Sequence, residues 1–282
     1  GAIFILSDSI KSSVEIEALS TSEVNFYMSN EASAVQMPFL ILAASLLALA
    51  GIVYKSNLPK LLSSTAKSNY SMALKDKKLK FGAFGIFVYV GAEVAIGSYL
   101  VNYFLDMNLA ELILENPFMR SIASIFHSNN LENIDAKAIV GTFVTFYWGG
   151  AMFGRFIGSY LTKVYRPQAV LSVFASLAII FIILSITTYG IFSLWTIIAV
   201  GLCNSIMFPT IFSIAIEDLG ELKPQGSGIL CTAICGGAFI PLVFGFFIDE
   251  VGFKLAYLFI IICYAYIFYF AKVSRKLNAI KS

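Results

Sequence analysis

Glu93 is the side chain whose chemistry most needs an explanation, because it is the only charged residue within the apolar segment 81–105. A carboxylate in the middle of a bilayer costs about 2.5 kcal/mol or more on insertion scales, so it needs a hydrogen-bonding partner or a wet cavity. Such a group can hydrogen-bond a polar substrate or take part in proton coupling, and we expect Glu93 to do so. The alternative is a structural hydrogen bond to a neighbouring helix.

The residues around Glu93 belong to a segment that we expect to be helical. The helical period places Tyr89, Glu93 and Gly97 on one face, whereas Asn102 lies nearly opposite. Gly91 and Gly97 flank the acid and can unwind the helix, which would turn Asn102 toward the same cavity, as in the discontinuous helices of transporters. The other interpretation is that these glycines allow close helix packing.

An aromatic and an amide side chain in two other apolar segments are further candidates for contact with a sugar. A sugar has apolar C–H faces that stack on aromatic rings, and its hydroxyls need a few fixed polar groups. Trp148 lies too deep in its segment for an interfacial belt, so it either stacks on a sugar or packs in the core. Asn204 either faces the cavity or makes a helix–helix hydrogen bond. The predicted substrate contacts are Tyr89, Glu93, Asn102, Trp148 and Asn204.

Arg155 lies in another apolar segment, 139–161, about one turn before its cytoplasmic end. One interpretation is that its long side chain extends to the lipid headgroups at little cost. The other is an ion pair with Glu217 or Asp218, at the cytoplasmic end of a different helix. Such a pair would be a cytoplasmic gating latch.

The composition excludes an ordinary soluble domain. Apolar residues make up 59% of the 282 residues and charged residues 13%, against roughly 45 to 50% and 25% in soluble domains. Apart from Arg155, basic residues are confined to loops, which argues against a nucleic-acid partner. The four cysteines lie in apolar runs without metal-binding spacing, and no catalytic or cofactor-binding motif is present. We therefore expect no enzyme, no cofactor and no metal site.

Seven apolar stretches are long enough to cross a bilayer as helices, since a spanning helix needs about 20 residues. They are 37–54, 81–105, 139–161, two within 168–216, 227–248 and 255–271. The two within 168–216 are expected to join at Thr188–Gly190, because glycine interrupts helices. The predicted fold is an all-α integral membrane protein.

The distribution of basic residues predicts the orientation of these helices. Seven lysines lie in the linker 55–80, and further basic residues follow the segments 139–161 and 255–271. These loops are expected in the cytoplasm, and residues 7–36, 106–136 and 249–254 outside. The predicted division is a truncated helix end and outside loop (1–36), a helix (37–54), a basic linker (55–80), a six-helix block (81–271) and a cytoplasmic tail (272–282).

Several segments resemble the fucose:proton symporter family of the major facilitator superfamily, in particular its glucose/galactose transporter branch. The similar segments follow the family's order and are YVGAEVAIGSYLVNY (89–103), GRFIG (154–158), FPTIFS (208–213), GSG (226–228), and GG (236–237) followed by Pro241, Gly245 and Asp249. The resemblance implies a twelve-helix major facilitator fold, of which the chain holds helix six and the six-helix carboxy-terminal half.

The resemblance also implies hexose:proton symport by alternating access, across the bacterial cytoplasmic membrane, by a monomer embedded in lipid. Fucose-specific members carry Gln where this chain has Glu93, which favours a glucose- or galactose-like sugar. Residues 158–166 are similar to a degenerate copy of the superfamily's cytoplasmic loop signature, with Thr162 in place of Asp. The family's main proton-coupling carboxylates lie in its other half. The alternatives are a sugar sensor without transport and an efflux antiporter of the same fold.

Overall fold

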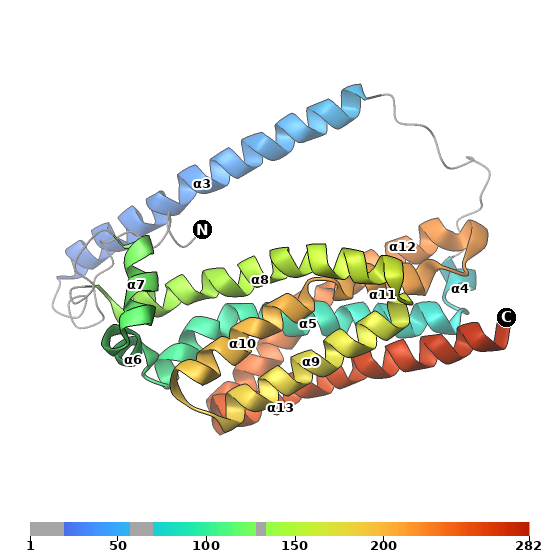
Figure 1. Cartoon of the computed structure of the whole chain (residues 1–282). Coiled ribbons are helices and arrows are strands. Elements are labelled where there is room, and N and C mark those ends of the chain that lie inside the picture. Colours follow the sequence, from blue (N-terminus) through green and yellow to red (C-terminus); the bar gives the residue numbers. More distant parts are fainter. Residues whose placement is uncertain (1–19, 57–69, 128–133, 282) are drawn as a thin grey trace.

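The computed structural model describes residues 20–56, 70–127 and 134–281, and every regular element in these ranges is helical (Figure 1). This confirms the predicted all-α fold. The predicted helix end at the start of the chain and most of the basic linker lie outside the described residues. The division into five regions stays a prediction.

The described helices differ in length. They are α3 (Thr21–Lys55), α4 (Tyr70–Ala73), α5 (Lys77–Asp106), α6 (Leu109–Glu115), α7 (Pro117–Phe126), α8 (Ala136–Val164), α9 (Pro167–Thr187), α10 (Gly190–Asn204), α11 (Met207–Ile216), α12 (Lys223–Thr232) and α13 (Gly236–Lys281), with short 3-10 turns at Gly220–Leu222 and Ala233–Cys235.

Residues with special backbone or capping chemistry set several of these boundaries. Asp76 begins α5 by accepting a hydrogen bond from the Leu79 amide at 2.8 Å. Gly190 has a φ of +66°, which separates α9 from α10 at the predicted hinge. Gly252 has a φ of +77° and divides α13 into two limbs. The seventh predicted span lies on the second limb, and the sixth runs from α12 through a 3-10 turn into the first limb.

Two predicted loops contain helices. Residues 21–36 belong to α3, because Ser20 and Glu23 form a capping box in which the Glu23 carboxylate accepts from the Ser20 amide at 3.0 Å. Residues 106–136 contain α6 and α7, and α7 starts where Asn116 caps the amides of Phe118 and Met119. Polar, charged sequences therefore form helices here because local capping groups are present.

Five helical stretches among the described residues are long and apolar enough to cross a membrane: Gln36–Lys55, Lys77–Asp106, Pro167–Thr187, Gly190–Ile216 and Gly220–Lys276. The last includes the kink at Gly252 and so holds two predicted spans. The helix α8 is long enough, with 29 residues, but is not among the five. Its glycines, threonines and charged residues dilute its apolar side chains.

The helix α5 lies at the centre of the bundle, where α13, α11 and α8 pack against it (Figure 1). The helix α10 packs between α8 and α9. In contrast, α3 lies apart from this bundle, and its apolar stretch has no buried residue. The six-helix block is thus the part of the chain that positions the candidate site.

Glycines on α8 allow it to approach α10 closely. A Cβ atom at Gly154 would lie 2.5 Å from the Leu202 carbonyl oxygen and 2.5 Å from Ser205 Oγ. Gly158 and Gly201 are similarly obstructed, by Ile206 and by the backbone of Tyr147. Small residues that let backbones approach are the usual means of joining helices in a membrane, where apolar side chains gain little by leaving lipid.

Replacing Gly154 with Ala should therefore destabilise the bundle by about 1 to 3 kcal/mol, the usual cost of overpacking. The added methyl group meets a backbone carbonyl, which cannot move without shifting α10. Thermal unfolding of the purified protein in detergent measures this change.

Gly149→Ala is the matched control, since a Cβ atom at Gly149 would have no atom within 4 Å. Equal melting temperatures for the two variants would show that the α8–α10 contact is looser than described.

Candidate functional site

The side chain of Asn204 is the centre of a buried polar network. Its Nδ2 donates to the Tyr147 hydroxyl at 2.9 Å, and its Oδ1 accepts from the Tyr264 hydroxyl at 2.7 Å. The Tyr89 hydroxyl donates to the Asn204 backbone carbonyl at 2.9 Å. Asn204 is 1% exposed. One residue of α10 thereby binds α5, α8 and α13 together.

A break between two helices explains why this network forms here. The helix α10 ends at Asn204, and α11 begins only at Met207. A helix end leaves backbone carbonyls without their intrahelical partners, and in a bilayer these must be satisfied by the protein. Tyr89 supplies the donor to the Asn204 carbonyl. The discontinuous helix is therefore α10–α11.

Glu93 lies on α5 beside this network and is half-buried. Its backbone carbonyl accepts a hydrogen bond from the Tyr147 hydroxyl at 3.3 Å. Its carboxylate interacts electrostatically with the hydroxyl of Tyr89, one turn away on α5, and with the guanidinium of Arg155 on α8. The carboxylate thus has both a polar neighbour and a countercharge within the bundle.

Trp148 covers the next turn of α5. A Cβ atom at Gly97 would lie 2.7 Å from the Trp148 ring, so the absence of a side chain at Gly97 makes room for the indole. The ring of Trp148 meets that of Tyr147 edge to face, with centroids 5.2 Å apart and an interplanar angle of 84°. Because Trp148 is still 48% exposed, its indole has surface left for a ligand.

These side chains together form a surface on α5 and α8 that suits a neutral polar ligand. The half-buried Glu93 carboxylate can accept hydrogen bonds from hydroxyls, and the adjacent exposed indole can stack on apolar C–H groups. Tyr89 and Tyr147 hold this surface in place through Asn204. Among the described residues, no group of three or more His, Cys, Asp or Glu side chains could hold a metal ion.

Sugar transporters are the proteins that this chain is similar to. It is 41% identical over 255 residues, or 87% of the chain, to a glucose/galactose transporter of Brucella abortus. It is 39% identical over 247 residues, or 86% of the chain, to a putative glucose/galactose transporter of Helicobacter pylori. It is 30% identical over 269 residues, or 91% of the chain, to the L-fucose-proton symporter of Escherichia coli. No family model matches the chain.

The solved structures show the same fold. A crystal structure of the E. coli fucose:proton symporter has a TM-score of 0.72 and 25% identity, over 96% of this chain and 62% of that one. The same transporter in the outward conformation, described as a major facilitator superfamily member, has a TM-score of 0.71 and 26% identity.

The chain belongs to the fucose:proton symporter family of the major facilitator superfamily. It spans about half the length of the curated relatives it matches, 55% of the B. abortus transporter and 54% of the H. pylori one. The matched part is the carboxy-terminal part of these relatives, which are named as transporters and not as enzymes. Its apolar helices and bacterial relatives place the chain in the inner membrane as a multi-pass protein.

Two predicted sugar contacts of this family member lie elsewhere than expected. Asn102 is exposed on the face of α5 away from Glu93, because α5 stays helical through Gly91 and Gly97 instead of unwinding. Both glycines serve close packing, Gly91 against Ile240 and Gly97 against Trp148. The side chain of Asn204 is buried and occupied by two tyrosines. Its position suits the structural alternative, a helix–helix hydrogen bond.

The predicted latch also has different partners. Glu217 and Asp218 bind Lys78, at 2.8 and 3.3 Å, and these ion pairs join the start of α5 to the end of α11. Arg155 is exposed on α8, where its charge acts on Glu93. The structure thus pairs the two acids with Lys78 and not with Arg155, because the packing of the helices, which the sequence does not indicate, brings Lys78 nearest to them.

Lys78 and Tyr264 are the important residues that the sequence did not single out. Lys78 is one of seven lysines in a basic stretch, and only its burial, at 4% exposed, distinguishes it. Tyr264 is one of 14 tyrosines. A possible signal was the presence of a hydroxyl deep within an apolar helix, which needs a hydrogen-bond partner when buried.

Asn204→Leu should lower the free energy of unfolding by about 1 to 3 kcal/mol, because it leaves the buried Tyr264 hydroxyl without its acceptor. Thermal unfolding tests this directly. Asn102→Leu is the matched control and should leave the melting temperature unchanged, since Asn102 is exposed. If both variants melt like the unmodified protein, Asn204 does not hold the helices together.

Lys78→Gln should destabilise the bundle by about 1 to 2 kcal/mol, between the values for exposed and buried ion pairs. The control Lys77→Gln removes an exposed lysine next to it in sequence and should have no effect. The original latch would instead require Arg155→Gln to destabilise the protein as much as Lys78→Gln. Melting temperatures of the three variants decide between these pairings.

Proposed function

We propose that the protein containing this chain imports a hexose together with protons, and that the chain supplies one wall of the sugar site. The observation that supports this most strongly is the pairing of the Glu93 carboxylate with the exposed Trp148 indole on adjacent helices. A carboxylate and an aromatic ring side by side satisfy the two kinds of surface that a sugar presents. The most similar named relatives cited above are glucose/galactose transporters, and this favours glucose or galactose as the substrate.

Each residue of the site has a distinct part in this function. Glu93 accepts hydrogen bonds from sugar hydroxyls, and Trp148 stacks on the sugar ring. The hydrogen bond to the Asn204 backbone carbonyl holds Tyr89 next to Glu93, and the Tyr89 hydroxyl oxygen can accept a hydrogen bond from Glu93 when that carboxyl is protonated. Arg155 is the countercharge that makes an ionised Glu93 tolerable within the bundle. Neutralising Glu93, by a proton, would release Arg155 and link protonation to the arrangement of α5 and α8.

Alternating access provides the transport step. The sugar site lies on helices near the middle of the bilayer, and the other half of the transporter provides the opposite wall. The lipid bilayer surrounds the outer helices, the coupling ion is a proton, and the working unit is a monomer. Sugar therefore reaches the site from one side of the membrane and leaves on the other.

Uptake of labelled glucose, galactose and fucose into proteoliposomes, with and without an inward proton gradient, tests this function. Accumulation of glucose or galactose that requires the gradient is expected. Glu93→Gln should lower sugar affinity by about tenfold, the equivalent of one lost charged hydrogen bond, or remove the dependence of uptake on the gradient. It should leave the melting temperature unchanged.

The control is a substitution that keeps an amide side chain at a position on the far face of α5. Asn102→Gln should transport like the unmodified protein. If Glu93→Gln also transports normally at every pH, Glu93 has no part in the mechanism. If no sugar accumulates in correctly oriented protein, the symport function is wrong.

A further inference from the structure

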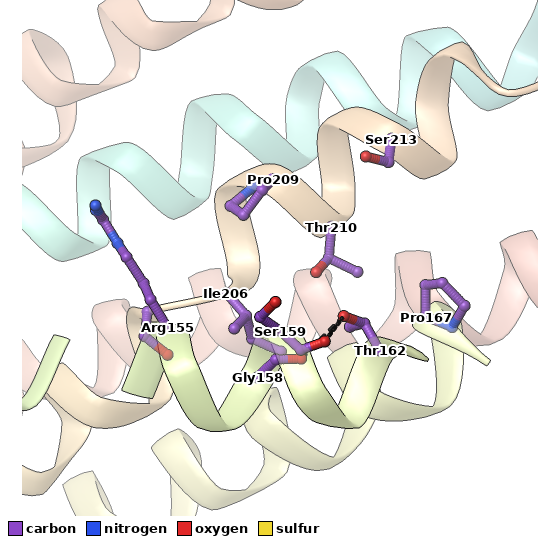
Figure 2. A pocket seen from close by; sticks show the side chains of 10 residues that line it. Arg155, Gly158, Ser159, Thr162, Pro167, Ile206, Pro209, Thr210 and Ser213 are labelled. Carbon is purple, nitrogen blue, oxygen red and sulfur yellow. Dashed lines mark hydrogen bonds between the residues drawn. The ribbon is translucent and has the colours of Figure 1, made fainter. Parts of the chain in front are cut away.

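A cavity of about 490 Å³ lies between α8 and α11 (Figure 2), and its lining residues include neither Glu93 nor Trp148. Its volume is in the range of small-molecule sites. It runs along the half of α8 that ends at Lys163 and Arg166, and so toward the cytoplasm under the predicted orientation. Five hydroxyl side chains line it: Ser159 and Thr162 from α8, and Ser205, Thr210 and Ser213 from α11 and the turn before it.

One of these hydroxyls lacks the partner that a buried polar group requires. Ser205 is 4% exposed, and its Oγ has no hydrogen bond within the part of the chain that the structure describes. Buried hydroxyls are nearly always hydrogen-bonded to protein, water or ligand. Its Oγ faces Gly154 of α8, where an added Cβ atom would lie 2.5 Å from it, so this hydroxyl belongs to the helix contact behind the cavity and the accessible hydroxyls are those of the other four residues.

The charges and hydrogen-bonding groups of the lining residues indicate which class of ligand the cavity suits. No carboxylate lines the cavity, so it is not suited to a cation. Arg155 lies at one end, but its side chain extends away from the hydroxyls toward α5 (Figure 2), where its charge acts on Glu93. An anion would therefore lack a countercharge. Hydroxyls that both donate and accept hydrogen bonds remain, and these suit a neutral polyhydroxylated molecule.

The position of the cavity connects it to the sugar site. Along α8, the 14 residues from Trp148 to Thr162 cover about 21 Å at 1.5 Å per residue, and Arg155 lies midway. A sugar that leaves the Glu93–Trp148 surface toward the cytoplasm would pass Arg155 and enter the cavity. The cavity has no aromatic ring among its lining residues and no charged anchor directed into it, so it would hold such a molecule weakly and let it go.

We propose that the cavity between α8 and α11 is a second, low-affinity sugar position, through which the hexose passes on its way to the cytoplasm. This inference rests on the proposed sugar transport. It assigns Ser159, Thr210 and Ser213 to release of the sugar and not to its initial binding. Filling the cavity should therefore slow transport without weakening binding at the main site.

Two variants of the full-length protein, Ser213→Trp and Ser159→Trp, place a large side chain in the cavity from opposite walls. Both positions are exposed. Each should slow hexose uptake into proteoliposomes by at least about tenfold while sugar affinity stays within about twofold. Ala265→Trp is the control, since Ala265 is exposed on α13 and does not line the cavity. Its uptake should be unchanged. Melting temperatures verify that all three variants fold.

A second measurement detects the sugar in the cavity. Ser213→Cys, made after replacing the exposed Cys231 and Cys235 with Ala, should react with an impermeant thiol reagent from the cytoplasmic side. Hexose should slow this reaction, and at higher concentrations than those that saturate the main site. Mannitol, which the transporter is not expected to carry, serves as the comparison polyol and should protect less.

Normal uptake by both Trp variants, or thiol labelling that bound hexose leaves unchanged, would overturn the inference. Protection by anionic lipid vesicles in place of hexose would do the same, because the cavity would then be a lipid site. If the unmodified protein neither binds nor transports any hexose, the proposed function itself fails, and the inference fails with it.

Discussion

An amide side chain in a helix bundle within lipid must have every polar atom satisfied by protein, because no water is at hand to replace a missing partner. Asn204 meets this constraint with two tyrosine hydroxyls, and its backbone carbonyl is satisfied by a third. The three tyrosines come from three different helices, so satisfying one residue fixes the relative positions of four helices. The break between α10 and α11 is possible for the same reason.

The candidate sugar surface depends on this network. Tyr89 and Tyr147 are both bound to Asn204 and both next to Glu93: Tyr147 donates to the Glu93 carbonyl, and Tyr89 interacts with its carboxylate. Movement of α10 would therefore be transmitted to Glu93 through two hydroxyls, one beside its carboxylate and one bound to its backbone carbonyl. In the proposed transport cycle, this connection would link the candidate sugar surface to the discontinuous helix α10–α11.

Charged groups occur in two separate sets along the helices. Lys78, Glu217 and Asp218 form ion pairs between the start of α5 and the end of α11, where part of the group is in contact with solvent. Glu93 lies in the middle of α5, where a carboxylate within a bilayer is costly unless another group balances it, and the charge of Arg155 acts on it. The first set joins two helices, whereas the second belongs to the candidate sugar surface.

Local sequence determined the helical class, the approximate spans, the hinge at Gly190 and the shared face of Tyr89, Glu93 and Gly97. These depend on apolar length, backbone preference and helical period, which are properties of neighbouring residues. Only the tertiary structure decided the partners of the polar side chains. Tyr264 and Asn204 are 60 residues apart, and Lys78 and Glu217 are 139 apart, so their bonds depend on which helices become neighbours. Asn102 remained on the far face of α5 because packing of Gly91 and Gly97 kept that helix continuous, and no local pattern distinguishes a glycine that packs from one that unwinds.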